Sequence, residues 1–210
     1  QDLVLDNDSG ARRPNGLPLK IIIAAAFCWS IFQLWISSPL PFILNIFVLD
    51  DTKSRYIHLS FAIFLVFLSY PFTKRSPRDY IPVADWLIAI IASFSALYLL
   101  VFYEQLSQRA GLPNRYDVII SWVGIIFLVE ATRRALGPPL AIIATIFLVY
   151  TFAGRYMPEV IMHKGHNLEK IASHQWLATE GVFGIALGVS TSFVFLFVLF
   201  GDMDRRLGRL

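Results

Sequence analysis

The sequence predicts an all-α membrane protein with about six transmembrane helices, both termini in the cytoplasm and short helices at the membrane surface. Hydrophobic residues make up 56% of its 210 residues and charged residues only 16%. A soluble domain has roughly 45–50% apolar and about 25% charged residues. The mean hydropathy is +0.61, and the apolar residues come in long blocks separated by charges. These features indicate a chain dissolved in lipid.

Six blocks approach the roughly 20 residues that a helix needs to cross a hydrocarbon core about 30 Å thick. They cover residues 17–38, 56–72, 83–103, 118–136, 138–153 and 179–201. Gly137 and Pro138 separate the fourth block from the fifth. Glycine ends helices well and proline begins them, so a tight turn is predicted there. Residues 39–51 and 167–176 are expected to lie along the outer membrane surface, the second as a short helix capped by Asn167.

The distribution of positive charge predicts the orientation, because cytoplasmic connections are enriched in Lys and Arg. Of the 18 Lys and Arg residues, 11 lie before or at the start of the first block, after the last block, or at the alternate connections, including the block ends beside them. These are Arg12, Arg13, Lys20, Lys74, Arg75, Arg78, Arg133, Arg134, Arg205, Arg206 and Arg209. The other connections hold 7. Lys74, Arg75 and Arg78, with the nearby Trp86, are candidates for contact with lipid headgroups.

Glu130, Arg133 and Arg134 are the first candidate site residues, because charge at the edge of a membrane span is costly unless paired. The spacings from Glu130 are i,i+3 and i,i+4, so ion pairs within one helix are available. The group either ends a cytoplasmic helix or fixes a neighbouring protein surface. Asp85 and Glu180 are each expected to be interfacial acids at helix N-termini, which the helix dipole favours.

Small residues recur along the last block at Gly181, Gly184, Gly188 and Ser192. Such faces let helices approach closely in lipid. They serve either packing within the bundle or docking of a partner membrane subunit.

Few residues suggest catalysis or metal binding. His163, His166 and His174 lie in one connection outside the spans, whereas a membrane haem needs buried histidines on facing helices. The lone Cys28 and the absence of nearby carboxylates argue against zinc. The scattered basic residues argue against nucleic-acid binding. No enzyme activity, metal or cofactor is expected.

Three stretches resemble the N-terminal part of the fused permease of TAXI-type TRAP transporters. They are residues 130–134, residues 163–176, and residues 179–201 with the run TEGVFGIALGVS followed by FVFLFVLFG. The resemblance implies a polar cytoplasmic segment (1–16), a four-helix Q-type small membrane portion (17–136) and a connecting helix with an extracytoplasmic loop (137–166). Residues 167–210 would then hold an interfacial helix, the first helix of the M-type portion and a cytoplasmic tail.

The family imports small organic acids, driven by an ion gradient, after a solute-binding protein delivers them. The resemblance therefore implies a scaffold or docking portion in a bacterial or archaeal cytoplasmic (inner) membrane. Its partners would be a large M-type subunit or domain, an extracytoplasmic solute-binding protein and the bilayer. The substrate site and the coupling ion, Na⁺ or H⁺, are expected on the large portion. The alternatives are a stand-alone membrane adaptor or assembly protein and, more remotely, a membrane redox subunit.

Overall fold

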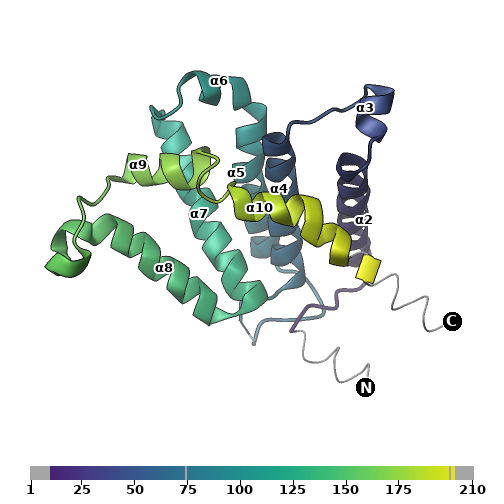
Figure 1. The fold of residues 1–210 in the computed structure, drawn as a ribbon. Coiled ribbons are helices and arrows are strands. Elements are labelled where there is room, and N and C mark those ends of the chain that lie inside the picture. Colours follow the sequence, from purple (N-terminus) through teal and green to yellow (C-terminus); the bar gives the residue numbers. More distant parts are fainter. Residues whose placement is uncertain (1–9, 74, 199, 202–210) are drawn as a thin grey trace.

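In the computed structural model, four helices lie side by side and alternate in direction along the chain (Figure 1). The structure describes residues 10–73, 75–198 and 200–201. The four helices are α2 (Leu17–Ser37), α4 (Asp51–Ser69), α5 (Val83–Val101) and α7 (Arg115–Leu136). Two short helices, α3 (Leu40–Leu44) and α6 (Tyr103–Gln108), lie at the same end of this bundle. The described residues form helices and turns and contain no strand, as the sequence predicts.

Within the described residues, three helices are long and apolar enough to cross a membrane. They are Leu17–Ser37, Val83–Val101 and Pro138–Tyr156. The α4 and α7 helices are long as well, but charged residues occupy their first turns, including Asp51 and Asp117. Three helices therefore support the assignment to the membrane class. The prediction of six spans goes beyond what helix length and composition support.

The α4 and α5 helices form the centre of the bundle, with their backbones close together. Ala89, Ala92 and Ala96 of α5 are fully buried, and small side chains allow helices to approach closely. Ser60 of α4 donates to the carbonyl of Ser93, and Ser93 of α5 donates back to the carbonyl of Ser60, both at 3.2 Å. This reciprocal pair locks the register of the two helices.

A short segment after the fifth predicted block folds back onto α5 and α7. The α9 helix (Leu168–Ala172) begins at Asn167, whose side chain accepts a bond from the Lys170 amide at 3.0 Å, so the predicted cap is confirmed. A π-helical turn (Ser173–Leu177) follows and carries Trp176 into the core. The indole is fully buried, lies against Gly124 of α7 and donates to the Ser95 carbonyl at 3.2 Å. The segment is thus anchored in the bundle.

Two apolar helices lie outside the set of four parallel and antiparallel helices. The α8 helix (Pro138–Ala153) follows α7 directly at Gly137, which has a φ of 91°, so the predicted Gly-Pro turn is confirmed. It diverges from the other helices (Figure 1) and ends in the 3-10 turns Gly154–Tyr156 and Glu159–Ile161. The last helix, Ile185–Val198, comprises α10 (Ile185–Val189), the π-helical turn Ser190–Val194 and the residues after it. It crosses α4 and α2.

The start of the last helix differs from the prediction. We expected a span over residues 179–201 with Glu180 at its N-terminus, but the helix begins at Ile185 and Glu180 lies in the preceding turn. The Val182 amide donates to the Gln175 carbonyl, and the Gly184 amide to the Gly181 carbonyl. These bonds close a turn that brings Gly181 against the backbone of Gln175. Local apolarity could not reveal this return toward an earlier segment.

The contact between Gly124 and Trp176 predicts a stability effect. A Cβ at position 124 would overlap the buried indole ring, and overpacking typically costs about 1–3 kcal/mol. We expect Gly124→Ala to lower the unfolding temperature of the detergent-solubilised protein. Tryptophan fluorescence measured during heating reports the unfolding. Gly201→Ala is the control, since a Cβ there meets no atom within 4 Å. Equal unfolding temperatures for both variants would contradict this packing.

Candidate functional site: an arginine–carboxylate network

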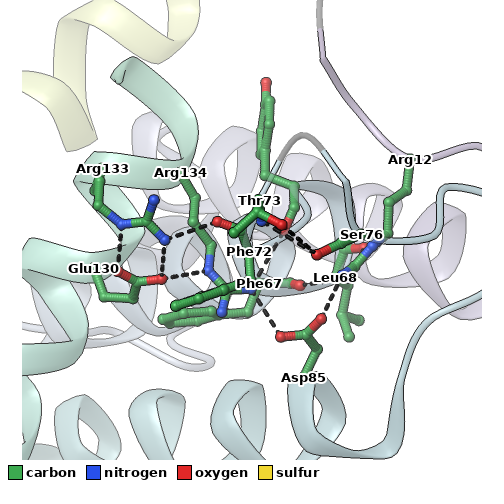
Figure 2. A network of polar contacts seen from close by, with 11 residues as sticks. Arg12, Phe67, Leu68, Phe72, Thr73, Ser76, Asp85, Glu130, Arg133 and Arg134 are labelled. Atoms are coloured by element: carbon green, nitrogen blue, oxygen red, sulfur yellow. Dashed lines mark hydrogen bonds and ion pairs between the residues drawn. The ribbon is translucent and has the colours of Figure 1, made fainter. Parts of the chain in front are cut away.

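Five charged side chains meet at one end of the bundle (Figure 2). Arg12 comes from the segment before α2, Asp85 from the first turn of α5, and Glu130, Arg133 and Arg134 from the last turns of α7. This group is called the arginine–carboxylate network below. It joins three parts of the chain that are distant in sequence.

Asp85 is the centre of the network. Its Oδ2 pairs with Nη2 of Arg12, and its Oδ1 accepts from Nη1 of Arg134 at 2.8 Å. The side chains of Arg12, Arg134 and Asp85 are only 0%, 1% and 7% exposed. Burying a charge is costly unless it is paired and hydrogen-bonded, so each of these groups depends on the other two.

Glu130 extends the network along α7. Its carboxylate accepts from Nε and Nη2 of Arg133, both at 2.7 Å, and from Nε of Arg134 at 2.8 Å. Both ion pairs that the sequence spacing makes available are therefore formed. Arg134 binds Glu130 through Nε and Asp85 through Nη1, and so links α7 to α5.

Arg12 and Arg133 also donate to backbone carbonyls at, and just after, the carboxyl end of α4. Arg12 Nη1 donates to the Phe67 carbonyl at 3.3 Å, and Arg133 Nη2 donates to the Phe72 carbonyl at 2.9 Å. The last carbonyls of a helix have no partner within the helix and carry partial negative charge. Arg134 also lies 4.8 Å from the centroid of the Phe67 ring, within the range of a cation–π contact. Arginines from two segments thus hold the end of α4.

The chemistry of the network is structural. Both carboxylates are occupied by guanidinium groups, which join the segments that carry them. With both acids ionised, three guanidinium groups face two carboxylates, so the network keeps one uncompensated positive charge. Arg133 is the most exposed of the three arginines, at 35%. The excess charge is therefore closest to the surface at Arg133.

A second polar cluster stabilises the opposite end of the bundle. Asp117 of α7 is fully buried and accepts from the Tyr98 hydroxyl at 2.6 Å and from Arg109 at 3.0 Å. Its other oxygen accepts from the Asn114 amide at 2.8 Å, which completes a capping box. A cavity of about 910 Å³ lies beside this cluster, lined by residues of α4, α5, α6 and the segment 167–180. Its lining mixes both charge signs, including Lys170 and Glu180.

The small residues of the last helix pack inside the chain. Arg55 of α4 donates to the carbonyls of Phe183 and Gly184 at 2.9 and 3.1 Å, and a Cβ at Gly188 would overlap its guanidinium group. The fully buried Gln33 of α2 donates to the Thr191 carbonyl at 2.7 Å. Gly184 and Gly188 therefore contact Arg55 of α4 within the chain.

The other predicted site residues lie apart from the network. Glu180 is exposed and pairs with His174 at 3.4 Å, while Ser192 is exposed and donates to the Gly188 carbonyl of its own helix. Among the candidates for lipid contact, Trp86 is partly buried beside Phe64. Arg75 and Arg78 are exposed near the network end of the bundle, and Lys74 lies outside the described residues.

The histidines form no metal site in the part of the chain that the structure describes. His163 binds the Tyr150 carbonyl through Nε2 and accepts from the Gly165 amide through Nδ1. No group of three or more His, Cys, Asp or Glu side chains in the described ranges could hold a metal ion. His163 therefore has a structural role, joining the end of α8 to the loop after it.

Comparison with known proteins leaves the family open. No family model, curated protein or solved structure matches this chain. The resemblance to TRAP permeases stays a prediction from the sequence.

Several residues that hold the structure together were not identified from the sequence. Arg12 was counted only as a charge that sets the orientation, and Asp85 was expected to be an interfacial acid at a helix N-terminus. Arg55, Gln33 and Asp117 were not singled out at all. A polar residue within an apolar block, such as Gln33, was the available signal, because an unpaired polar group in lipid is costly. Nothing local identified its partner, the Thr191 carbonyl, 158 residues further along the chain.

Removal of the Asp85 charge should destabilise the bundle. Asp85→Asn leaves Arg12 and Arg134 buried without their shared counter-ion, and breaking a buried pair costs about 3–5 kcal/mol. We expect a large drop in the unfolding temperature in detergent. Asp79→Asn is the control, because Asp79 is exposed near the same end of the bundle.

A double-mutant cycle separates the ion pair from other effects of the substitution. Asp85→Asn combined with Arg12→Gln should destabilise by less than the sum of the single variants, since the two side chains are in contact. Strict additivity would show that Arg12 and Asp85 do not interact in the folded protein.

Proposed function

We propose that this chain is the membrane scaffold and docking portion of a TRAP-type secondary transporter that imports small organic acids. The proposal depends on a contrast between two parts of the chain: the four-helix bundle is held together by buried polar contacts, whereas the α8 helix diverges from it. Buried ion pairs fix α5 to α7 and to the segment before α2, and Arg12 of that segment donates to the Phe67 carbonyl at the end of α4. In contrast, α8 exposes apolar side chains on several faces, including Leu140, Ile143 and Phe147. A rigid bundle with an uncovered apolar arm is suited to hold a neighbouring membrane protein.

The proposed topology has six spans with both termini in the cytoplasm of a bacterial or archaeal cell. On this topology the arginine–carboxylate network lies at the cytoplasmic interface, where snorkelling arginines are favoured. The cavity beside Asp117 and the short α3 and α6 helices then face the outside. The exposed apolar residues of α3, such as Phe42 and Ile43, would rest in the outer membrane surface.

In this function the chain holds a larger M-type partner level in the bilayer and remains nearly rigid while the partner moves substrate. The partner carries the substrate and the coupling ion, and a solute-binding protein supplies the substrate from outside. The internal hydrogen bonds to the last helix support rigidity, because Arg55 and Gln33 fix it to α4 and α2. A stand-alone membrane adaptor is the second candidate, and the same exposed arm would serve it.

The docking role predicts a specific effect of substitutions on α8. Leu140→Ala with Ile143→Ala should reduce recovery of a larger membrane chain co-purified with the tagged protein, because truncated contacts at interface centres often cost more than about 1 kcal/mol each. Ile31→Ala with Leu34→Ala is the matched control. That pair has the same spacing on α2 and similar exposures, 51% and 45% against 48% and 50%.

Uptake measurements separate the two candidates. A scaffold requires both chains for organic acid uptake into cells, and the α8 pair should lower uptake along with co-purification. Transport by the purified chain alone in liposomes would refute the scaffold role. Recovery of a larger membrane partner with no effect on uptake would favour the adaptor.

A further inference from the structure

A groove of about 750 Å³ runs between α7 and α8. It forms because α8 diverges from α7 after Gly137, so the two helices contact each other mainly near their shared turn. Its walls are apolar, with Val129 on α7, Ala141, Ile142, Ile146 and Val149 on α8, and Met157 beyond it. An aliphatic chain is the chemical group that such walls accept.

The polar side chains of the groove are satisfied internally except at one end. The Thr145 hydroxyl donates to the Ala141 carbonyl at 2.7 Å, and the Tyr150 hydroxyl donates to the Ile161 carbonyl at 2.8 Å. Arg133 lines the groove near Pro138. It is the one charged side chain among the described lining residues.

Arg133 has hydrogen-bonding capacity left for a ligand. Its Nε and Nη2 bind Glu130 and the Phe72 carbonyl, but Nη1 has no hydrogen-bond partner among the residues the structure describes. Figure 2 shows no interaction at this nitrogen. The uncompensated positive charge of the network is thus offered where the apolar groove begins. An anionic oxygen is the natural partner for such a donor.

We propose that this groove binds one anionic phospholipid, with the phosphate at Nη1 of Arg133 and an acyl chain between α7 and α8. The groove residues of α8 extend from Pro138 to Tyr150, which is about 18 Å at roughly 1.5 Å per residue. One leaflet of the hydrocarbon core is about 15 Å thick. The charged end and the apolar length together match an amphiphile better than free phosphate or a fully apolar helix.

The proposal depends on membrane insertion of the chain and not on a transport role. Native mass spectrometry tests it on full-length protein taken from vesicles of mixed phosphatidylglycerol and phosphatidylcholine into mild detergent. We expect the wild-type chain to retain one phosphatidylglycerol in preference to phosphatidylcholine. Arg133→Gln should reduce that preference about fivefold, the effect of one basic residue near an anionic headgroup.

Two further variants make the result specific. Thr145→Trp fills the groove and leaves Arg133 in place, so it should prevent retention of the lipid. Lys20→Gln removes one positive charge from an exposed site at the start of α2, at the same end of the bundle, and should leave retention unchanged. If Arg133→Gln proves unstable, Thr145→Trp alone decides the outcome.

Three results would overturn the proposal. Equal loss in Lys20→Gln and Arg133→Gln would mean diffuse attraction to headgroups. Undiminished lipid retention in Thr145→Trp would mean that no acyl chain enters the groove. Arg133 would then bind only a phosphate group, and the groove would play no part. Loss of a co-purified membrane chain in Thr145→Trp with unchanged lipid would mean that a protein helix fills it. Leu140 and Ile143 do not line the groove. The effect of substituting them on partner docking is therefore independent of lipid binding in the groove.

Discussion

The buried carboxylate of Asp85 is the constraint on which the arrangement of the bundle depends. It lies between the guanidinium groups of Arg12 and Arg134, which are almost completely shielded from solvent. None of the three charges could remain buried without the others. The segment before α2, the start of α5 and the end of α7 must therefore meet at one point. The same arginines bind the last carbonyls of α4, so all these elements have a common end.

Between the two polar clusters at the ends of the bundle, close backbone packing holds the helices together. Alanines on α5 and the reciprocal serine bonds bring α4 and α5 together. Apolar side chains cover the outside, where lipid would solvate them. The α2 helix and α8 are mostly exposed, which is costly in water and acceptable in a bilayer. A rigid centre with lipid-facing arms follows from these two properties, and it motivates both the scaffold role and the lipid site.

Features that depend on neighbouring residues could be predicted from the sequence. The pairs of Glu130 with Arg133 and Arg134, the cap at Asn167 and the turn at Gly137 all depend on residues within four positions. The helical blocks were also found, because apolar composition over about 20 residues is a strong signal. The ends of the helices were predicted less well, because a helix can begin with charged residues outside the apolar block, as α4 does at Asp51.

Features that depend on distant residues could not be predicted in this way. Arg12 and Asp85 are 73 positions apart, and Arg55 is 128 positions from the carbonyl of Phe183. In the sequence, Trp176 belongs to a polar connection. In the structure its ring is buried in the core, in the space left by the absence of a side chain at Gly124. In each case the partner is fixed by how the helices pack, and the local sequence does not specify that packing.

On the proposed topology, the arginine–carboxylate network lies at the cytoplasmic face of a lipid-embedded bundle. Cysteine labelling in intact cells tests it most directly, because Cys28 is the only cysteine and can be replaced by serine. Arg75→Cys probes the network end, and Leu112→Cys probes the opposite end, where Leu112 is 79% exposed. A membrane-impermeant maleimide should label Leu112→Cys on intact cells and Arg75→Cys only after permeabilisation. Labelling of both positions on intact cells, or of Arg75→Cys alone, would contradict the account.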